Sequence, residues 1–209
     1  MIEAPPQRRG FNRKSLIEKL KIVVLFAFIA ILVYKSQPKP LLFAIGAALT
    51  LIGIAIRIWA AGHLTRDQRL AVSGPYAYTR NPFYLGRFSI LIGFALMSGL
   101  HGFIVWTIFL ISLGFFFFGY MPRKERREGG RLEELFGDQF RKYRENVPSL
   151  FPRLTPYRDP FTAEKRPWNR DLFFFGKETG FVGNKELPTS IATLLLIALF
   201  FLRLVTLKP

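Results

Sequence analysis

Five stretches of this chain are apolar enough to be considered as membrane spans. The clearest is Phe103–Met121, which contains no charged residue. The others cover Leu20–Tyr34, Leu41–Ala61, Pro82–Leu100 and Ile191–Leu207. A helix needs about 20 predominantly apolar residues to cross a bilayer. We therefore predict an all-α, polytopic integral membrane protein with about five transmembrane helices. For the last run, a helix that lies in the membrane interface remains an alternative.

Basic residues alternate between the loops in the way that a membrane topology requires. Lys and Arg number six up to Lys21, three in residues 63–82 and fifteen in residues 122–188. The loop between the first and second apolar runs carries only Lys35 and Lys39, and the loop between the third and fourth runs carries no basic residue. Because cytoplasmic loops hold the excess of Lys and Arg, we predict a cytoplasmic N-terminus and an external C-terminus.

The composition argues against several classes of function. A net charge of +16 suggests nucleic-acid binding as one function to consider. The basic residues, however, lie beside apolar runs, as they do in membrane proteins. No nucleic-acid partner is therefore expected. The chain has no cysteine, which excludes disulfides and thiolate metal sites. His63 and His101 are predicted on opposite sides of the membrane, so no metal site is expected. Arg57, inside the second apolar run, is either functional or extends toward the interface.

Four segments follow from these patterns. Residues 1–21 form a basic cytoplasmic segment, and residues 22–155 form the membrane core. Residues 156–188 mix proline, aromatic and charged residues, which favours an extended excursion along the membrane surface. Residues 189–209 form a C-terminal transmembrane helix.

Within the core, Arg131–Val147 is predicted to be a cytoplasmic amphipathic helix. Its apolar residues recur at helical spacing on one face: Leu132, Leu135, Phe136, Phe140, Tyr143 and Val147. Pro148 is expected to end the helix. The helix would pack on the cytoplasmic side of the bundle or lie on lipid headgroups.

The most structured polar stretch reads GPYAYTRNPFYLG and runs from Gly74 to Gly86. Asn81 and Pro82 suit the N-cap and first position of a helix, and a helix N-terminus favours an anion. Arg80 adds a guanidinium that can bind a carboxylate or phosphate through two hydrogen bonds. Taken alone, however, a capped helix with interfacial Arg and Tyr side chains is the simpler interpretation.

This stretch resembles the signature of the isoprenylcysteine carboxyl methyltransferase and phospholipid methyltransferase superfamily. A second segment resembles that family one hairpin later: Glu125 and Glu128, then LEELFGDQFRKY from Leu132, then Val147 and Pro148. The sequence AAGHL that begins at Ala60 is similar to a bacterial branch, which implies a bacterial inner membrane.

The resemblance implies methyl transfer from S-adenosylmethionine to a membrane-borne lipid or isoprenyl-like acceptor. It implies that Arg80, Asn81 and Glu125 are catalytic. The residues expected to bind the cofactor are Tyr76, Tyr78, Arg80, Asn81, Pro82, Tyr84, Leu85, Gly86, Glu125, Glu128 and Tyr143. Arg80 and Asn81 would hold the carboxylate of the cofactor, the two glutamates its ammonium, and the tyrosines its adenine or sulfonium. Membrane lipids are expected partners.

The second segment departs from the family pattern. Glu125 and Glu128 are separated by bases instead of standing side by side, and Gly129-Gly130 is expected to break the helix. These departures favour an alternative, a catalytically silent relative that serves as a subunit of a larger membrane complex. A weaker alternative is a relative of the membrane sterol reductases, which the shortness of the chain argues against.

Overall fold

The computed structural model describes residues 27, 29–64, 69–100, 103–161, 166–174 and 186–207. All regular elements in these ranges are helical, which confirms the all-α prediction for them. After a helical segment at 29–35, the elements are α2 (Pro40–Ala61), the 3₁₀ turn η1 (Gly74–Ala77), α3 (Pro82–Ser98), α4 (Phe103–Gly114), the π-helical η2 (Phe115–Tyr120), α5 (Met121–Asn146), α6 (Arg170–Phe174) and α7 (Glu186–Thr206).

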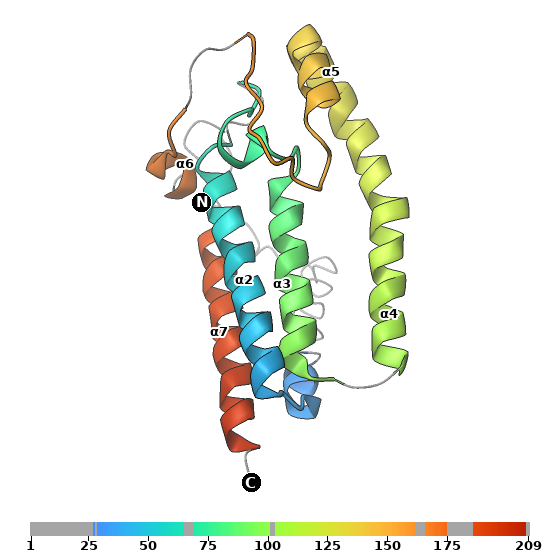
Figure 1. Ribbon diagram of the computed structural model, residues 1–209, viewed down its shortest axis with the longest axis vertical. Helices are drawn as coiled ribbons and strands as arrows, with labels where there is room; N and C mark the ends of the chain where they lie inside the picture. The colour runs from blue at the N-terminus through green and yellow to red at the C-terminus, as the bar shows by residue number, and fades with distance from the viewer. Residues whose placement is uncertain are drawn as a thin grey trace, which may run out of the picture.

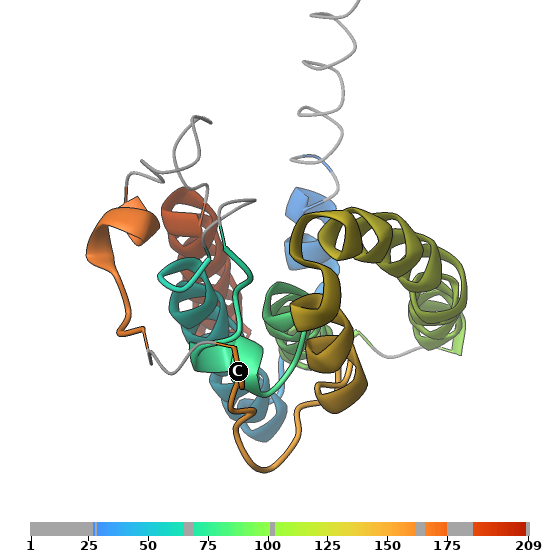
Figure 2. The ribbon, with the colours of Figure 1, turned by 90° about the horizontal axis from the view of Figure 1, so that it is seen from above.

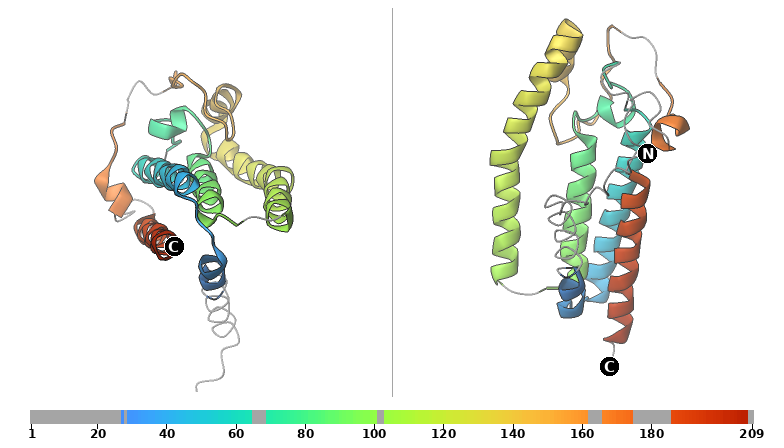
Figure 3. Two further views of the ribbon diagram at one scale, coloured as in Figure 1. Left: turned by 60° about the horizontal axis from the view of Figure 1, so that its bottom comes forward. Right: turned by 180° about the vertical axis from the view of Figure 1, so that it is seen from behind.

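The long helices form two groups that meet at one end of the molecule. α2, α3 and α7 run side by side, and the continuous arm of α4, η2 and α5 stands beside α3 (Figure 1). Seen from above, this arm lies on the opposite side of α3 from α7 (Figure 2). The loops around η1 and α6 gather where α2 ends and α3 begins, and the C-terminus lies at the other end (Figure 3).

Glycines allow α2 and α3 to approach each other closely. A Cβ atom on Gly53 would lie 2.5 Å from the carbonyl oxygen of Gly86, and one on Gly46 would lie 2.5 Å from that of Gly93. The reciprocal Cβ atoms meet the opposite backbone at 2.7 and 2.5 Å. Because each helix places its two glycines seven residues apart, both lie on one face. The helix backbones therefore touch at two points, as in small-residue packing within membranes.

Two described helices are long and apolar enough to cross a membrane: α2 and α7. In α7 only 11% of the apolar window is buried, and its exposed side chains include Leu195 and Phe201. An exposed apolar surface of this size is costly in water, so the protein is membrane-associated. The prediction of five spans is not established, and most of the expected first span lies outside the described residues.

The last apolar helix is anchored by an ion pair in the bundle. Arg57 of α2 donates from Nε and Nη2 to the two carboxylate oxygens of Glu186, both at 2.9 Å. Its Nη1 also donates to the carbonyl of Phe83 at 3.3 Å. The two charged side chains are only 8% and 12% exposed. Arg57 therefore joins α2 to α7 and α3 instead of reaching toward the interface.

The predicted break at Gly129-Gly130 is wrong, and so is the predicted start of a separate helix at Arg131. α5 runs from Met121 to Asn146, with a kink at Gly137, where φ is 49° and ψ is −125°. That backbone conformation favours glycine, whereas Gly129 and Gly130 both stay helical. The expected end before Pro148 is confirmed, because α5 ends at Asn146.

A π-helical turn precedes Pro122 at the start of α5. In η2 the amide of Met121 donates to the carbonyl of Phe116, five residues back. A proline inside an α-helix lacks one N–H and collides with the carbonyl four residues before it. The wider π turn accommodates this position, so the apolar α4 continues without a break into the charged α5.

The segment 156–188 is not wholly extended, because it contains the short helix α6. Trp168 donates from its indole N–H to the carbonyl of Ile58 at 3.0 Å, and its ring fills the space beside Gly62. Asn169 accepts hydrogen bonds from the amides of Asp171 and Leu172 and so caps α6. These contacts attach α6 to the end of α2.

Candidate functional site

The candidate site begins with the turn at Gly74, which brings the signature stretch across the end of α2. Gly74 has a φ of 60°, in the left-handed region that favours glycine. A Cβ at this position would also lie 2.6 Å from the ring of His63. That ring is held by a 2.9 Å hydrogen bond with the carbonyl of Trp59. The glycine that opens the signature is therefore required by both conformation and space.

Backbone hydrogen bonds hold the signature stretch against the chain that follows α5. They run from Arg80 N–H to Pro148 O at 2.9 Å, from Arg153 N–H to Tyr78 O at 3.0 Å, and from Tyr157 N–H to Ala77 O at 2.9 Å. The two segments that resemble the family thus form one unit, although about 70 residues separate them in the chain.

Tyr143 and Tyr76 lie inside this unit instead of lining an open surface. Tyr143 is 3% exposed and Tyr76 is 6% exposed. The Tyr143 hydroxyl donates to the carbonyl of Tyr76 at 2.8 Å. Burial raises the pKa of Tyr143 well above its usual value, so the phenol stays a neutral donor. Phe140 and Val147 complete the small core around Tyr143.

The side chain of Thr79 adds hydrogen bonds between the same two segments. Its hydroxyl lies 3.1 Å from the carbonyl of Ser149 and 3.0 Å from that of Leu150, and the residue is 1% exposed. Thr79→Val is expected to lower the free energy of unfolding by about 1–3 kcal/mol, because it removes the hydroxyl donor from the buried carbonyl of Leu150. Hydrogen exchange of the 147–157 amides should accelerate. The exposed Thr155→Val is the control, and equal exchange in both variants would contradict this role.

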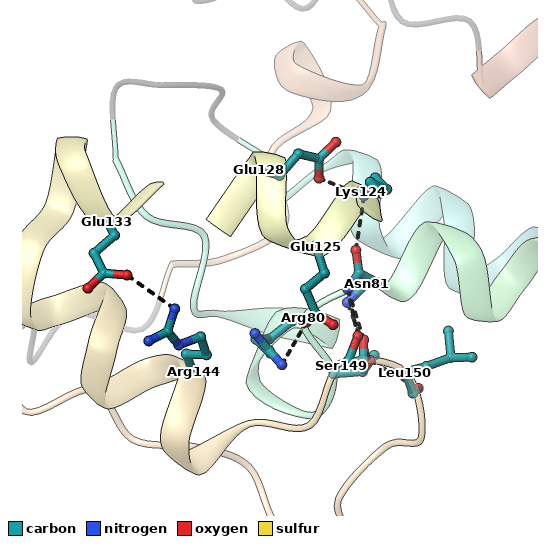
Figure 4. Close-up of polar contacts among 10 residues, drawn as sticks. Arg80, Asn81, Lys124, Glu125, Glu128, Glu133, Arg144, Ser149 and Leu150 are labelled. Carbon is teal, nitrogen blue, oxygen red and sulfur yellow. Dashed lines mark hydrogen bonds and ion pairs between the residues drawn. The ribbon is translucent and has the colours of Figure 1, made fainter. Parts of the chain in front are cut away.

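Charged and amide side chains converge where α3 starts and α5 passes by (Figure 4). Arg80 Nη2 forms an ion pair with Glu125 Oε1 at 2.7 Å. Lys124 Nζ donates to Asn81 Oδ1 at 3.1 Å and pairs with Glu128 at 2.6 Å. We call these five residues the polar network.

The polar network is connected to the segment after α5 and to the ring of Tyr84. Asn81 Nδ2 donates to the carbonyl and hydroxyl oxygens of Ser149 at 3.0 and 3.3 Å. Lys124 Nζ lies 4.4 Å from the centre of the Tyr84 ring, and the Tyr84 hydroxyl lies 3.1 Å from that of Tyr120. Arg80 Nε is buried and has no hydrogen-bond partner among the described residues. One donor of the network is therefore unpaired in this conformation.

The start of α3 differs from the simple anion site that the sequence predicts. Asn81 occupies the N-cap position, but its side chain makes no capping bond. Pro82 has no N–H, and the amide of Tyr84 donates to the carbonyl of Asn81 at 3.0 Å. Of the N–H groups in the first turn, only the amide of Phe83 is then left to face an anion. The guanidinium of Arg80 is therefore the main donor at this end of the helix.

The structure brings part of the predicted set together. Arg80, Asn81, Glu125 and Glu128 lie in the polar network, with Tyr84 beside it. Glu125 and Glu128 are three residues apart on one helix, so they share a face despite the bases between them. Their roles stay predictions.

The remaining predicted residues lie outside the polar network. Tyr78 packs against Trp59, with ring centres 6.2 Å apart. Gly86 faces Arg57, whose Cγ would lie 2.6 Å from an added Cβ. Pro82 is buried at the first position of α3, and Leu85 is half-buried. Pro82 and Gly86 have structural explanations in these positions.

Sequence reasoning missed Lys124 and Ser149. In the sequence, Lys124 is one of the fifteen basic residues of segment 122–188 that predict the topology. Its position four residues before Glu128 and next to Glu125 is the signal that could have singled it out. Ser149 carries no such signal, because its contact with Asn81 depends on the chain folding back after α5.

Three known proteins are similar to this chain. The cobalt-zinc-cadmium resistance protein of Cupriavidus metallidurans is 26% identical over 160 residues, which cover 73% of this chain and 71% of that protein. The nickel-cobalt-cadmium resistance protein of Alcaligenes xylosoxydans xylosoxydans is 26% identical over 169 residues, covering 77% and 76%. The protein-S-isoprenylcysteine O-methyltransferase of Schizosaccharomyces pombe is 32% identical over 94 residues, covering 45% of this chain and 37% of the enzyme.

No family model and no solved structure matches the chain. The methyltransferase similarity is partial, because it covers less than half of either chain. Within the described ranges there is no group of three or more His, Cys, Asp or Glu side chains that could hold a metal ion.

Proposed function

We propose that this protein is a membrane methyltransferase that uses S-adenosylmethionine to methylate a lipid or isoprenyl-like acceptor. The observation that carries the proposal is the ion pair between Arg80 and Glu125, which joins the two segments resembling the superfamily. The partial similarity to an isoprenylcysteine methyltransferase supports the same class of reaction. The proposal includes about five spans, a cytoplasmic N-terminus and a bacterial inner membrane.

The charges of the polar network suit the amino-acid portion of the cofactor. S-adenosylmethionine carries a carboxylate and an ammonium on the same carbon. Arg80 and Glu125 offer one opposite charge for each, at a separation of 2.7 Å between their nearest atoms. A ligand carrying both charges can therefore replace the pair contact without leaving either side chain unpaired.

The sulfonium of the cofactor would lie near aromatic rings. Tyr84 and Tyr120 lie beside the polar network, and the face of an aromatic ring attracts a sulfonium cation. Methyl transfer is an in-line displacement in which the acceptor attacks the methyl carbon as the carbon–sulfur bond breaks. Holding the two reactants in line supplies most of the rate. A carboxylate acceptor needs no base, because it has no proton to lose.

Substitutions in the ion pair test this proposal. Arg80→Gln and Glu125→Gln are each expected to weaken binding of radiolabelled S-adenosylmethionine by about 10- to 100-fold in equilibrium dialysis, because each removes a charge-assisted contact. Glu134→Gln, at an exposed position of α5, is the matched control and should bind like the unsubstituted protein. Unfolding temperatures identify any variant that binds poorly because it is misfolded. Unchanged affinity in both folded variants would contradict the proposed site.

The alternative is a catalytically silent subunit of a membrane complex. The existing Arg80–Glu125 contact is compatible with it, because the two charges neutralise each other without a ligand. A protein that binds no cofactor but copurifies with other membrane subunits would favour this alternative.

A further inference from the structure

A hollow of about 290 Å³ lies at the junction of the π-helical turn and α5. Its lining residues are Phe115, Tyr120, Arg123, Lys124, Arg127 and Glu128. Residues 120, 123, 124, 127 and 128 follow one another at the spacing of one helix face. The hollow therefore lies where the apolar arm becomes charged, which is the membrane interface in the five-span arrangement proposed above.

The charge of the hollow is positive and partly uncompensated. Arg123, Lys124 and Arg127 supply three cations, against the one carboxylate of Glu128. Glu128 already pairs with Lys124 at 2.6 Å. Arg123 and Arg127 form no ion pair with any described residue. Two guanidinium groups thus remain for an anion, and guanidinium suits phosphate oxygens through paired hydrogen bonds.

The side of the hollow nearer α4 is apolar and exposed. Ile111 and Phe115 are four residues apart, which places them on one side of the helix. They are 65% and 69% exposed. Tyr120 sits between these residues and the cations, as aromatic residues do at the headgroup level. A ligand that fits this surface has an anionic head and a hydrocarbon tail.

We propose that this hollow binds an anionic phospholipid. Arg123 and Arg127 hold its phosphate, and its acyl chains lie along Ile111 and Phe115. The hollow adjoins the candidate methyl-transfer site, because Tyr120, Lys124 and Glu128 line it, but neither arginine belongs to the polar network. A free phosphate ion would use the cations but would leave the exposed apolar face uncovered, so the lipid is the occupant that the surface favours.

Native mass spectrometry of the full chain in an uncharged detergent tests this proposal. Phosphatidylglycerol is titrated in, with phosphatidylcholine and inorganic phosphate as comparison ligands. Arg123→Gln and Arg127→Gln are each expected to weaken phosphatidylglycerol binding about tenfold, because each removes a charge-assisted hydrogen bond to the lipid phosphate. Arg126→Gln removes the same charge from an exposed neighbour outside the hollow and should weaken binding by less than about twofold.

The outcomes distinguish specific binding of lipid in the hollow from non-specific attraction to a basic surface. Equal weakening by all three substitutions would overturn the proposal, because surface charge alone would then explain binding. Equal binding of phosphatidylcholine, or saturation by inorganic phosphate with no preference for lipid, would also overturn it. Arg80→Gln should retain phosphatidylglycerol, so loss of cofactor binding and loss of lipid binding are distinguishable.

Discussion

Gly93→Leu is expected to prevent stable packing of α2 against α3, with a loss of more than about 3 kcal/mol in the free energy of unfolding. An added Cβ would lie 2.2 Å from Thr50 Oγ1 and 2.5 Å from the carbonyl oxygen of Gly46. The carbonyl belongs to a helix backbone, and the hydroxyl is held by a 2.8 Å bond to that same carbonyl. Neither atom can move aside alone, so the helices must separate.

Unfolding in mixed micelles by increasing sodium dodecyl sulfate measures this effect. Gly93→Ala should give an intermediate loss, because one methyl group already reaches both oxygen atoms. Gly114→Ala is the control: Gly114 ends an apolar helix, and an added Cβ meets nothing within 4 Å. Alanine favours helix over glycine by up to about 1 kcal/mol, so Gly114→Ala should keep or raise stability. A Gly93→Ala protein as stable as Gly114→Ala would refute the close crossing.

Glu186→Gln is the second substitution with a large expected effect. It leaves the guanidinium of Arg57 without its charged partner at a site where the side chain is only 8% exposed. Removing one member of a buried ion pair costs about 3–5 kcal/mol, because the remaining charge is uncompensated. Since Arg57 also bonds to Phe83 at the start of α3, the loss should loosen both α7 and the candidate site.

A double replacement distinguishes the pair from its individual charges. Arg57→Leu combined with Glu186→Leu should be close to the unsubstituted protein in stability, because apolar residues can replace a buried pair at little cost. Glu133→Gln provides a comparison at a partly exposed position, where the side chain is 29% exposed. Arg141 donates to Glu133 and lowers the pKa of its carboxyl group, but solvent screens the contact, so the unfolding temperature should hardly change. A double variant less stable than Glu186→Gln would contradict the account.

Local signals in the sequence predicted several elements. The apolar run Leu41–Ala61 corresponds to α2, Asn81-Pro82 to the start of α3, and Pro148 to the end of α5. At the last two boundaries a proline removes a donor or restricts the backbone. Such effects depend on neighbouring residues alone, so they can be read without knowledge of the fold.

Other features depend on residues that are distant in the chain. α7 begins at Glu186, five residues before the predicted apolar run, where Glu186 meets a partner 129 positions away. Lys124 joins Asn81 across 43 positions, and Ser149 joins the same side chain across 68. The kink at Gly137 was likewise missed, because Gly129-Gly130 is the stronger local signal for a break.

The same distinction applies to the candidate site. Arg80, Asn81 and the two glutamates were found through their resemblance to a family, whereas their spatial relation required the fold. The buried positions of Tyr76 and Tyr143 were not evident, since aromatic residues suit both a core and a ligand site.

Calorimetric titration of S-adenosylmethionine into the purified, unsubstituted protein tests the central claim most directly. The account predicts saturable heat with one site per chain, and competition by S-adenosylhomocysteine, which shares the carboxylate and ammonium that Arg80 and Glu125 would bind. Absence of saturable binding to a folded protein, confirmed by a cooperative thermal transition, would contradict the account and favour the catalytically silent subunit.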